Sequence, residues 1–428
     1  MRAGASTRRN FLQAAATTGA LTSGAHGLHA AGSDAIRVGL IGCGDRGTGA
    51  AAQALAADPG ARLVAMADAF EDRLTNSLEM LGTNEAIRSK VDVAPARRFV
   101  GFDTYRELLA SGVDVVLLCT PPHFRPIHLR AAVEAGKHVF AEKPVAVDAP
   151  GVRSVIESCR LAASRGLSIV SGLCLRYDDG FRQTVRRIHD GAVGGVATLL
   201  ANDYRGGRWA KPRQPGWTEM HYQMRNWYNF TWLSGDFNVE QHVHFLDVCA
   251  WIMKEQYPEK AVGMGGRQVL TGPEYGQIYD HFSVVYEYAD GIRLVSNCRQ
   301  QPLCKNDLSV RVLGTKGRAE LVERRGGLRV RSASGEWVYQ NRQSRNMYQV
   351  EHDELFASIR GGKPINNGEY MARSTLLAIM GRMAAYTGRE ITWQMAMDSK
   401  QALDPSAYAW DARPPAAVVA VPGQTRFL

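Results

Sequence analysis

The sequence of 428 residues contains no run of about 18 consecutive apolar residues, the minimum for a helix that spans a bilayer. It also lacks any block of about five or six consecutive basic residues, although 51 lysines and arginines outnumber 42 acidic residues. Scattered charge of this kind is typical of a solvated surface and not of a nucleic-acid-binding face. We therefore expect no nucleic-acid partner and, after processing, no membrane anchor.

The cysteines do not form an evident disulfide framework. There are seven, an odd number, and several lie inside apolar runs, as Cys43 does in "LIGCG" and Cys119 in "VVLLCT". Only Cys298 and Cys304 are close enough in sequence to suggest a local bridge. The others are expected to be small buried residues, as free cysteines usually are.

The first 33 residues differ in character from the remainder. They carry Arg8 and Arg9 before Phe11-Leu12 and a mildly apolar Ala/Thr/Gly run, and they contain no acidic residue. This pattern resembles a twin-arginine export signal, which a receptor reads as an address. We therefore expect residues 1–33 to be a signal peptide and the protein to be periplasmic or otherwise exported; an unstructured basic leader is the alternative.

After the leader, the chain changes pattern once. Over 34–165, apolar strand-like runs alternate with amphipathic helices, which predicts a parallel sheet wound with helices. Over 166–400, hairpins with Asp-Gly and Gly-rich turns predict an antiparallel sheet, followed by helices. The tail, 401–428, is rich in Pro and Ala and is expected to be irregular. Two domains and a tail follow.

A glycine loop follows the first apolar strand. "VGLIGCGDRG" places Gly42, Gly44 and Gly47 in G-x-G-x-x-G spacing, at the start of a helix. Asp68 ends the next strand, 21 residues after Gly47. This context predicts a dinucleotide whose pyrophosphate meets the helix N-terminus. Asp68 can accept hydrogen bonds from the adenosine ribose and would repel a 2′-phosphate, so NAD is favoured over NADP.

Glu142-Lys143-Pro144 ends a later buried strand in "HVFAEKP". The carboxyl edge of an open parallel sheet faces the ligand crevice, so a lysine there can stabilise negative charge on a reacting oxygen. A strand-end lysine that reaches solvent is an equally good interpretation of the residues alone.

The ordered set of the glycine loop, Asp68 and "CTPPHFRPIHLRAAVEAGKHVFAEKP" resembles the Gfo/Idh/MocA family, over about residues 36–400. The resemblance implies a Rossmann domain followed by an α/β domain with an open-faced, mainly antiparallel sheet. It also implies NAD(P)-dependent chemistry on a sugar or cyclitol, with Lys143 as the family lysine, and a homo-oligomer, either a dimer or a tetramer. The residues expected to bind the cofactor belong to the glycine loop and the strand ends: Gly42, Gly44, Asp45, Arg46, Gly47, Asp68, Thr120, Pro121, His123, Glu142 and Lys143.

The stretch "NVEQHVHFLD" is rich in acids and histidines. If 236–253 is one helix capped by Asp236, then Glu240, His244 and Asp247 share a face beside the buried stripe. His242 points elsewhere on such a helix and no cysteine is near, so no metal site is expected. The resemblance implies that His244 accepts the substrate proton, that Glu240 orients the substrate or His244, and that Lys143 holds the substrate oxygen. Two departures from the family pattern are Glu240, where an Asp is usual, and His242, where a Gly is usual.

The loop over 204–234 is aromatic and polar, with tryptophans at 209, 217, 227 and 232. Planar rings suit the apolar faces of sugars and arginines suit dense hydroxyls or carboxylates, so a carbohydrate ligand is plausible; the loop could equally pack between subunits or form a lid. The candidate substrate residues are Arg176, Tyr177, Asp247 and Trp227.

Three functions are consistent with these patterns. The first is an oxidoreductase that transfers hydride between tightly bound NAD and a sugar-like alcohol. The second is a glycoside hydrolase that oxidises a ring carbon transiently and eliminates the aglycone; its characteristic Gly-His motifs are not obvious. The third is a non-catalytic protein that retains the nucleotide.

Overall fold

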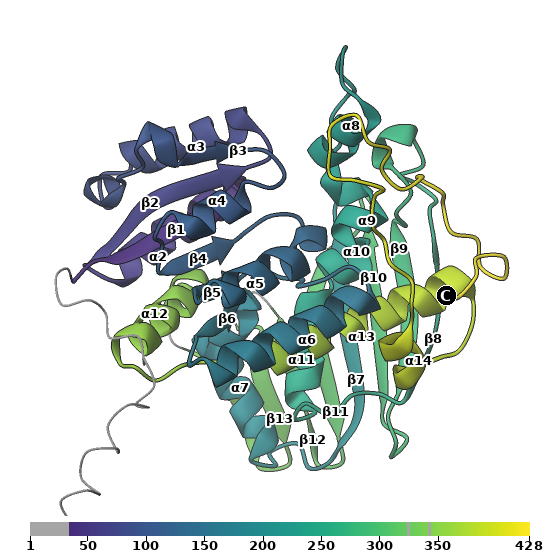
Figure 1. Ribbon diagram of the computed structural model, residues 1–428. Coiled ribbons are helices and arrows are strands. Elements are labelled where there is room, and N and C mark those ends of the chain that lie inside the picture. Colours follow the sequence, from purple (N-terminus) through teal and green to yellow (C-terminus); the bar gives the residue numbers. More distant parts are fainter. Residues whose placement is uncertain (1–33, 323–325, 341–343) are drawn as a thin grey trace, which may run out of the picture. The chain divides into compact units, whose positions relative to one another are not determined.

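The computed structural model describes residues 34–322, 326–340 and 344–428, and the predicted export signal at 1–33 lies outside them. The residues from 36 to 428 form one unit that contains two sheets (Figure 1). Within the described part of the chain, no helix has both the length and the apolar character needed to cross a membrane.

The first sheet has six parallel strands in the order β3-β2-β1-β4-β5-β6. The strands are β1 (Ile36–Ile41), β2 (Ala61–Asp68), β3 (Arg98–Val100), β4 (Val115–Leu118), β5 (His138–Ala141) and β6 (Ile169–Ser171). The helices that connect them are α2 (Asp45–Ala57), α3 (Glu71–Thr83), α4 (Tyr105–Ala110), α5 (Arg125–Glu134) and α6 (Ala149–Ser164), with 3₁₀ turns η1 (Arg88–Lys90), η2 (Pro95–Arg97) and η3 (Pro122–Phe124). This is the doubly wound order, in which ligands bind where the winding reverses, between β1 and β4.

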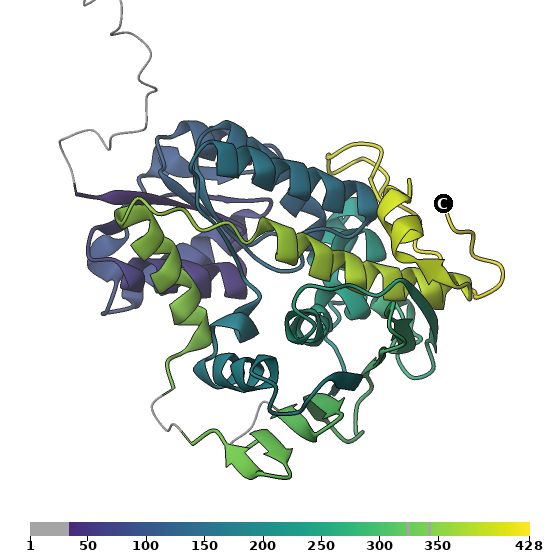
Figure 2. The ribbon, with the colours of Figure 1, turned by 90° about the horizontal axis from the view of Figure 1, so that it is seen from below.

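The central strands are apolar throughout because helices cover both faces of the sheet. One face packs on α2, α3 and α12 (Met347–Arg360), and the other on α4, α5 and α6. Figure 2 shows α12 lying along α2 although the two are separated by almost three hundred residues. The boundary expected at residue 165 is too early, since β6 pairs with β5 and completes the first sheet.

The second sheet has nine strands in the order β14-β13-β12-β11-β7-β10-β9-β8-β15. It is mainly antiparallel, with one parallel pair between β7 and β10. The strands are β7 (Val196–Arg205), β8 (Lys260–Gly266), β9 (His281–Glu287), β10 (Arg293–Gln300), β11 (Asp307–Gly314), β12 (Gly317–Val322), β13 (Leu328–Ser332), β14 (Gly335–Val338) and β15 (Ile391–Thr392). The expected fold class, a Rossmann domain and an α/β domain with a mainly antiparallel sheet, is confirmed.

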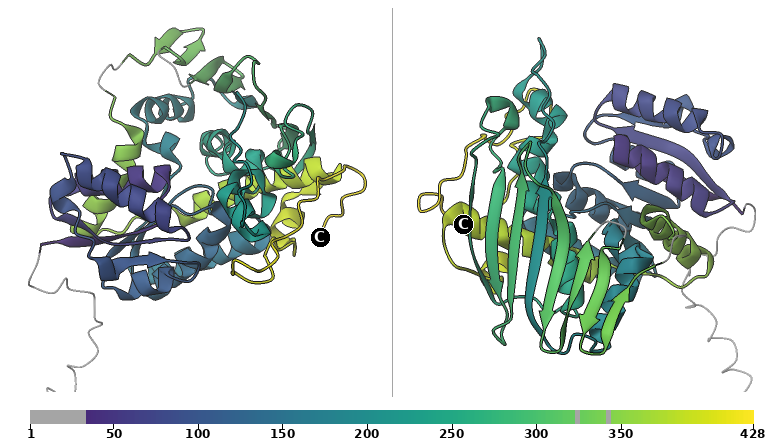
Figure 3. Two further views of the ribbon diagram at one scale, coloured as in Figure 1. Left: turned by 90° about the horizontal axis from the view of Figure 1, so that it is seen from above. Right: turned by 180° about the vertical axis from the view of Figure 1, so that it is seen from behind.

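Helices lie on one face of this sheet, and among the described residues the other face has no covering layer (Figure 3, right). The helices and turns of this half of the chain are η4 (Cys174–Tyr177), α7 (Asp179–His189), α8 (Glu219–Arg225), η5 (Trp227–Asn229), α9 (Thr231–Ser234), α10 (Phe237–Glu240), α11 (Val243–Ile252), η6 (Pro273–Tyr275), α13 (Gly368–Thr387) and α14 (Trp393–Asp398). The uncovered face leaves apolar side chains exposed, among them Val262, Met264 and Leu313.

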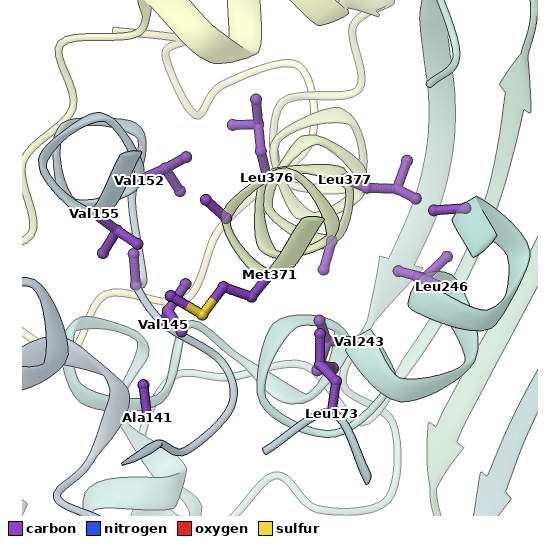
Figure 4. Close-up of a cluster of buried hydrophobic side chains, with 14 of the residues drawn as sticks. Ala141, Val145, Val152, Val155, Leu173, Val243, Leu246, Met371, Leu376 and Leu377 are labelled. Carbon is purple, nitrogen blue, oxygen red and sulfur yellow. The ribbon is translucent and has the colours of Figure 1, made fainter. Parts of the chain in front are cut away.

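Helix α13 joins the two halves. It is buried around nearly its whole circumference and packs on α6, α11 and β8. Figure 4 shows Met371 of α13 directed toward Val145, just beyond the end of β5, and Leu377 directed toward Leu246 of α11. One continuous apolar core therefore holds both sheets, and it fixes the distance between β5 and α11.

The expected single helix over 236–253 is interrupted. Asp236 does cap it, since its carboxylate accepts a hydrogen bond from the N–H of Phe237, but α10 ends at Glu240 and α11 begins at Val243. The break places Gln241 and His242 between two helical segments. Because the break is short, Glu240 and His244 still face the same side of the chain, toward β5 and η4, as the contacts below show.

Candidate active site

A cavity of about 590 Å³ lies at the carboxyl edge of the first sheet. One wall consists of the glycine loop and the residues that follow β2 and β4. The opposite wall comes from the second half of the chain, between β7 and α9. The principal lining residues are Gly42, Gly44, Asp45, Arg46, Gly47, Asp68, Phe70, Arg73, Phe102, Cys119, Thr120, Pro121, Trp209, Lys211, Met224, Arg225 and Trp227.

The three glycines of the loop fit a dinucleotide, each in a different way. Gly42 has φ +95°, and a Cβ there would lie 2.5 Å from the backbone nitrogen of Thr120. A Cβ at Gly47 would overlap the carbonyl oxygen of Gly42, so this glycine allows α2 to pack closely. A Cβ at Gly44 would meet no atom within 4 Å. No side chain obstructs the backbone of Gly44 on the cavity side, so a pyrophosphate can approach it closely.

Asp68 lies at the cavity wall with its carboxylate held by the backbone. Its Oδ2 accepts from the N–H of Cys43 at 2.6 Å and its Oδ1 from the N–H of Phe70 at 2.9 Å. Burial raises the pKa of Asp68, and these two hydrogen bonds oppose that effect. Each oxygen has a further lone pair, so the carboxylate can accept from the two hydroxyls of a ribose.

Arg46 belongs to the glycine loop, but its guanidinium is directed to protein partners. It pairs with Glu142 after β5 and donates to Gln53 and to Glu351 of α12, at 2.8 Å each. It also lies 5.0 Å from the ring centre of Tyr348. Arg46 therefore fixes the glycine loop to β5 and α12. Glu142 accepts a second hydrogen bond from the N–H of Lys143, which brings the loop and the lysine together.

Lys143 lies just beyond β5 and is bound to the end of α10. Its ammonium donates to the backbone carbonyl of Glu240 at 2.7 Å and to the Glu240 carboxylate at 2.9 Å. The two side chains are 13% and 9% exposed. With the Gln241 amide in its hydrogen-bonding orientation, its nitrogen donates to Glu240 at 3.2 Å and its oxygen accepts from Arg205 at 3.1 Å. Arg205 also donates to Asp203. Lys143 thus begins a partly buried chain of polar side chains that reaches Arg205 at the end of β7.

His244 stands beside this chain, at the first turn of α11. Its Nδ1 is 4.0 Å from the thiol sulfur of Cys174. Burial lowers the pKa of His244 well below its usual value, and the positive charges of Lys143, Arg205 and Arg46 act in the same direction. The imidazole is therefore neutral at pH 7, the form in which a general base acts, and its lowered pKa makes it a weaker base than an ordinary histidine.

Three of the predicted substrate residues have other partners. Asp247 is 1% exposed and forms a bidentate ion pair with Arg176, with both distances 2.8 Å, and it accepts from Ser374 at 2.7 Å. The buried Tyr177 donates to Asn367 at 2.8 Å. These contacts hold η4 and α13 against α11, and none of the three residues lines the cavity. Trp227 does line it.

The remaining predicted cofactor residues divide in the same way. Thr120 and Pro121 line the cavity, whereas His123 lies behind the wall with its Nε2 2.9 Å from the hydroxyl of Tyr408. Tyr408 belongs to the tail that was expected to be irregular. The tail has no helix or strand over 401–428, but its Tyr408 packs against the first half of the chain.

The tail and α8 together cover the ribose end of the cavity. Trp410 lies 5.0 Å from Phe70 and 4.5 Å from Phe102 between ring centres. Arg225 of α8 donates to both carboxylate oxygens of Asp72, at 2.8 and 2.7 Å, and its guanidinium carbon is 3.8 Å from the ring centre of Phe70. An ion pair and an aromatic cluster therefore hold the second half of the chain to the cofactor-binding edge.

Sequence reasoning missed several residues of this region. Arg205, Gln241, Lys211 and Arg225 were not singled out, although the loop that carries three of them was described as aromatic and polar. The available signal was the density of arginines and lysines in this loop, but tertiary packing determines which of them face the cavity. Among the described residues, no group of three or more His, Cys, Asp or Glu side chains is arranged to hold a metal ion.

Comparison with known proteins agrees with this architecture. Residues 36–171 match the NAD-binding Rossmann fold, and residues 187–373 the C-terminal α/β domain, of the Gfo/Idh/MocA oxidoreductase family. The chain belongs to this family. Its first domain is thus an NAD-binding Rossmann domain, and the protein is an oxidoreductase by family.

Individual relatives are more distant. Myo-inositol 2-dehydrogenase of Thermotoga maritima is 26% identical over 285 residues, which are 66% of this chain and 74% of that protein. Inositol 2-dehydrogenase of Rhizobium meliloti is 24% identical over 76% of this chain and 86% of its own length. The structure of aldose-aldose oxidoreductase from Caulobacter crescentus superposes with a TM-score of 0.66 at 19% identity, over 84% of this chain and 99% of that one. Scyllo-inositol dehydrogenase from Lactobacillus casei, solved with NAD(H) and scyllo-inositol, gives 0.64 at 18% identity, over the same two shares.

Proposed function

We propose that this protein oxidises a secondary alcohol of a sugar derivative or cyclitol with NAD⁺, or runs the reverse reduction. The observation that carries the proposal is the cluster of Lys143, Glu240 and the neutral His244 just beyond β5. Arg46 and Glu142 connect this cluster to the glycine loop of the cofactor cavity. The substrate class is supported by the inositol dehydrogenases and the aldose-aldose oxidoreductase among the similar proteins.

Each residue of the cluster has a distinct chemical task. The Lys143 ammonium binds the substrate oxygen and stabilises the negative charge that develops on it. His244 takes the hydroxyl proton, and Glu240 holds Lys143 in position through the 2.9 Å ion pair. NAD⁺, held by the glycine loop and Asp68, would supply the hydride acceptor for the carbinol carbon. The products are a ketone, NADH and one proton, which His244 then releases.

The cofactor is proposed to be NAD, held tightly. Asp68 favours NAD because its carboxylate would repel a 2′-phosphate. Retention is supported by the cover over the ribose end, formed by Arg225, Phe70 and Trp410, and by a leader that resembles an export signal. An exported dehydrogenase meets little free nucleotide, so we expect a second substrate to reoxidise NADH in place.

Self-association is proposed through the uncovered face of the second sheet. Exposed apolar side chains, Met264 at 72% exposure among them, lie on the strands of that sheet. Burial of such side chains is the usual reason for a stable dimer or tetramer.

The experiment that tests the function is incubation of the purified protein with a panel of cyclitols, aldoses and glycosides, with and without added NAD⁺. Net NADH, or transfer of hydride to an added sugar, supports the oxidoreductase. Release of aglycone without net NADH would favour the hydrolase, and no reaction with bound nucleotide present would favour the non-catalytic protein.

A further inference from the structure

The cofactor cavity contains more positive charge than the glycine loop alone requires. Its lining includes four cationic side chains, Arg46, Arg73, Lys211 and Arg225. Arg46 is bound to Glu142 and Glu351, as described above, and Arg225 forms two hydrogen bonds with Asp72. The charges of these two arginines are therefore neutralised by carboxylates of the protein.

Arg73 and Lys211 have no such close carboxylate partner among the described residues. Arg73 lies 3.7 Å from the carboxylate of Asp45, a distance at which an ion pair is weak. The ammonium of Lys211 makes no hydrogen bond or ion pair with any described residue. Burial lowers the pKa of Lys211, and the nearby Arg73 and Arg225 act in the same direction, with Asp72 and Asp45 opposing. An anion bound in the cavity would therefore stabilise the charged form of Lys211.

The backbone of Lys211 is held in place although it lies in a loop. Its N–H donates to the side chain of Asn226 at 2.6 Å, and the Asn226 amide donates back to its carbonyl at 3.2 Å. Asn226 is fully buried. The lysine is therefore presented to the cavity from a fixed position, which reduces the ordering cost of binding a ligand there.

We propose that Lys211 and Arg73 form a second phosphate-binding wall, so that the dinucleotide pyrophosphate is held between the glycine loop of one domain and a lysine of the other. The pyrophosphate is the favoured phosphate because Arg73 lies beside Asp45, the first residue of α2, and the first turn of that helix lines the cavity. A 2′-phosphate is the alternative source of the same charge, but Asp68 occupies the ribose edge. The inference rests on the proposed cofactor and adds a ligand from the substrate-binding half of the chain.

The test uses the full chain, stripped of nucleotide, and titrations with NAD⁺, ADP, adenosine and NADP⁺. Lys211→Met keeps the aliphatic stem and removes the charge; Lys211→Arg keeps a charge; Lys305→Met is the same substitution at an exposed lysine outside the cavity. A charge-assisted hydrogen bond to phosphate predicts that Lys211→Met weakens NAD⁺ and ADP by about 10- to 100-fold. Adenosine affinity should not change, Lys211→Arg should recover most of the loss, and Lys305→Met should have no effect.

The outcomes separate this inference from the proposed function. If wild-type protein binds NAD⁺ but Lys211→Met binds NAD⁺ and ADP as tightly, the second wall is wrong and the cofactor assignment stands. If only NADP⁺ binding weakens, Lys211 reads a 2′-phosphate and the pyrophosphate assignment is overturned. If the wild-type protein binds no dinucleotide at all, the proposed function itself fails. An unchanged melting temperature of nucleotide-free Lys211→Met shows that the fold is intact.

Discussion

Replacement of Lys143 by Met should affect stability and activity to different extents, and the difference distinguishes a catalytic lysine from a structural one. Lys143 and Glu240 form a pair whose side chains are 13% and 9% exposed. Removal of one member of a buried pair costs about 3–5 kcal/mol, because the remaining charge is left without its partner. Here the Gln241 amide still donates to Glu240, so we expect about 2–3 kcal/mol.

This cost corresponds to a modest change in melting temperature. Unfolding entropy is about 2.1 cal/mol/K per residue, so for the 393 residues of the folded unit the expected fall in Tm is about 2–4 °C. The double variant Lys143→Met/Glu240→Gln removes both charges and should regain most of that loss. Both variants should nevertheless lose about two to four decades of turnover, since neither has a cation to hold the reacting oxygen.

The assay is thermal unfolding of the three proteins, together with the rate of NADH formation under the conditions that the substrate panel identifies. NAD binding is measured in parallel and should remain within a few-fold of wild type. Near-normal turnover in Lys143→Met would remove the lysine from the mechanism. Recovery of turnover in the double variant would show that Lys143 acts only by neutralising Glu240.

Four further outcomes follow from particular contacts. The pKa of His244 lies well below its usual value, so the acid limb of the pH profile of kcat/KM for alcohol oxidation should lie below pH 6.5. Arg205→Met removes one of the neighbouring positive charges and should shift that limb to higher pH; a limb at unchanged pH excludes the electrostatic role of Arg205. Stripped protein should bind NAD⁺ more tightly than NADP⁺, and Asp68→Ala should reduce the ratio; equal binding by the wild type contradicts the assignment. Protein purified without added nucleotide should carry NAD(H) at a substantial fraction of one per chain, and Arg225→Met, which opens the cover, should lose it on gel filtration; a wild type free of nucleotide defeats the retention proposal. Burial lowers the pKa of the His242 imidazole from 6.5 to about 3, so as pH falls the unfolded state binds a proton at this histidine before the folded state does. The unfolding free energy should therefore decrease below pH 6.5, by up to about 1.4 kcal/mol per pH unit for each such histidine. If the decrease is equally steep in His242→Asn, His242 does not contribute to it.

From local patterns we expected those parts of the candidate site that follow from the geometry of single strands and helices. The glycine loop, Asp68 and the strand-end Lys143 each follow a buried strand, and in a parallel sheet all strand ends of one sense meet at one edge. Glu240 and His244 were expected on a shared face, and both lie against Lys143 or Cys174 even though the helix breaks between them. A spacing of four residues tolerates such a break when both sides remain helical.

Long-range packing determines the remainder. The spacing that grouped Asp247 with His244 could not indicate that Arg176 would occupy its carboxylate, because the two are 71 residues apart. The tail had no periodicity, so its aromatic contacts with Phe70 and Phe102 had no signature in the sequence. The orientation of Lys211 depends on the buried Asn226, a contact that no local propensity predicts.

One measurement tests the central claim most directly: single-turnover spectroscopy of the protein with its bound nucleotide, mixed with each member of the cyclitol and sugar panel. We expect at least one polyol to convert bound NAD⁺ to NADH at close to one equivalent per occupied site in the wild type, and at a rate lower by about two to four decades in Lys143→Met. A nucleotide that stays oxidised with every polyol, or that is reduced equally fast in both proteins, would contradict this expectation.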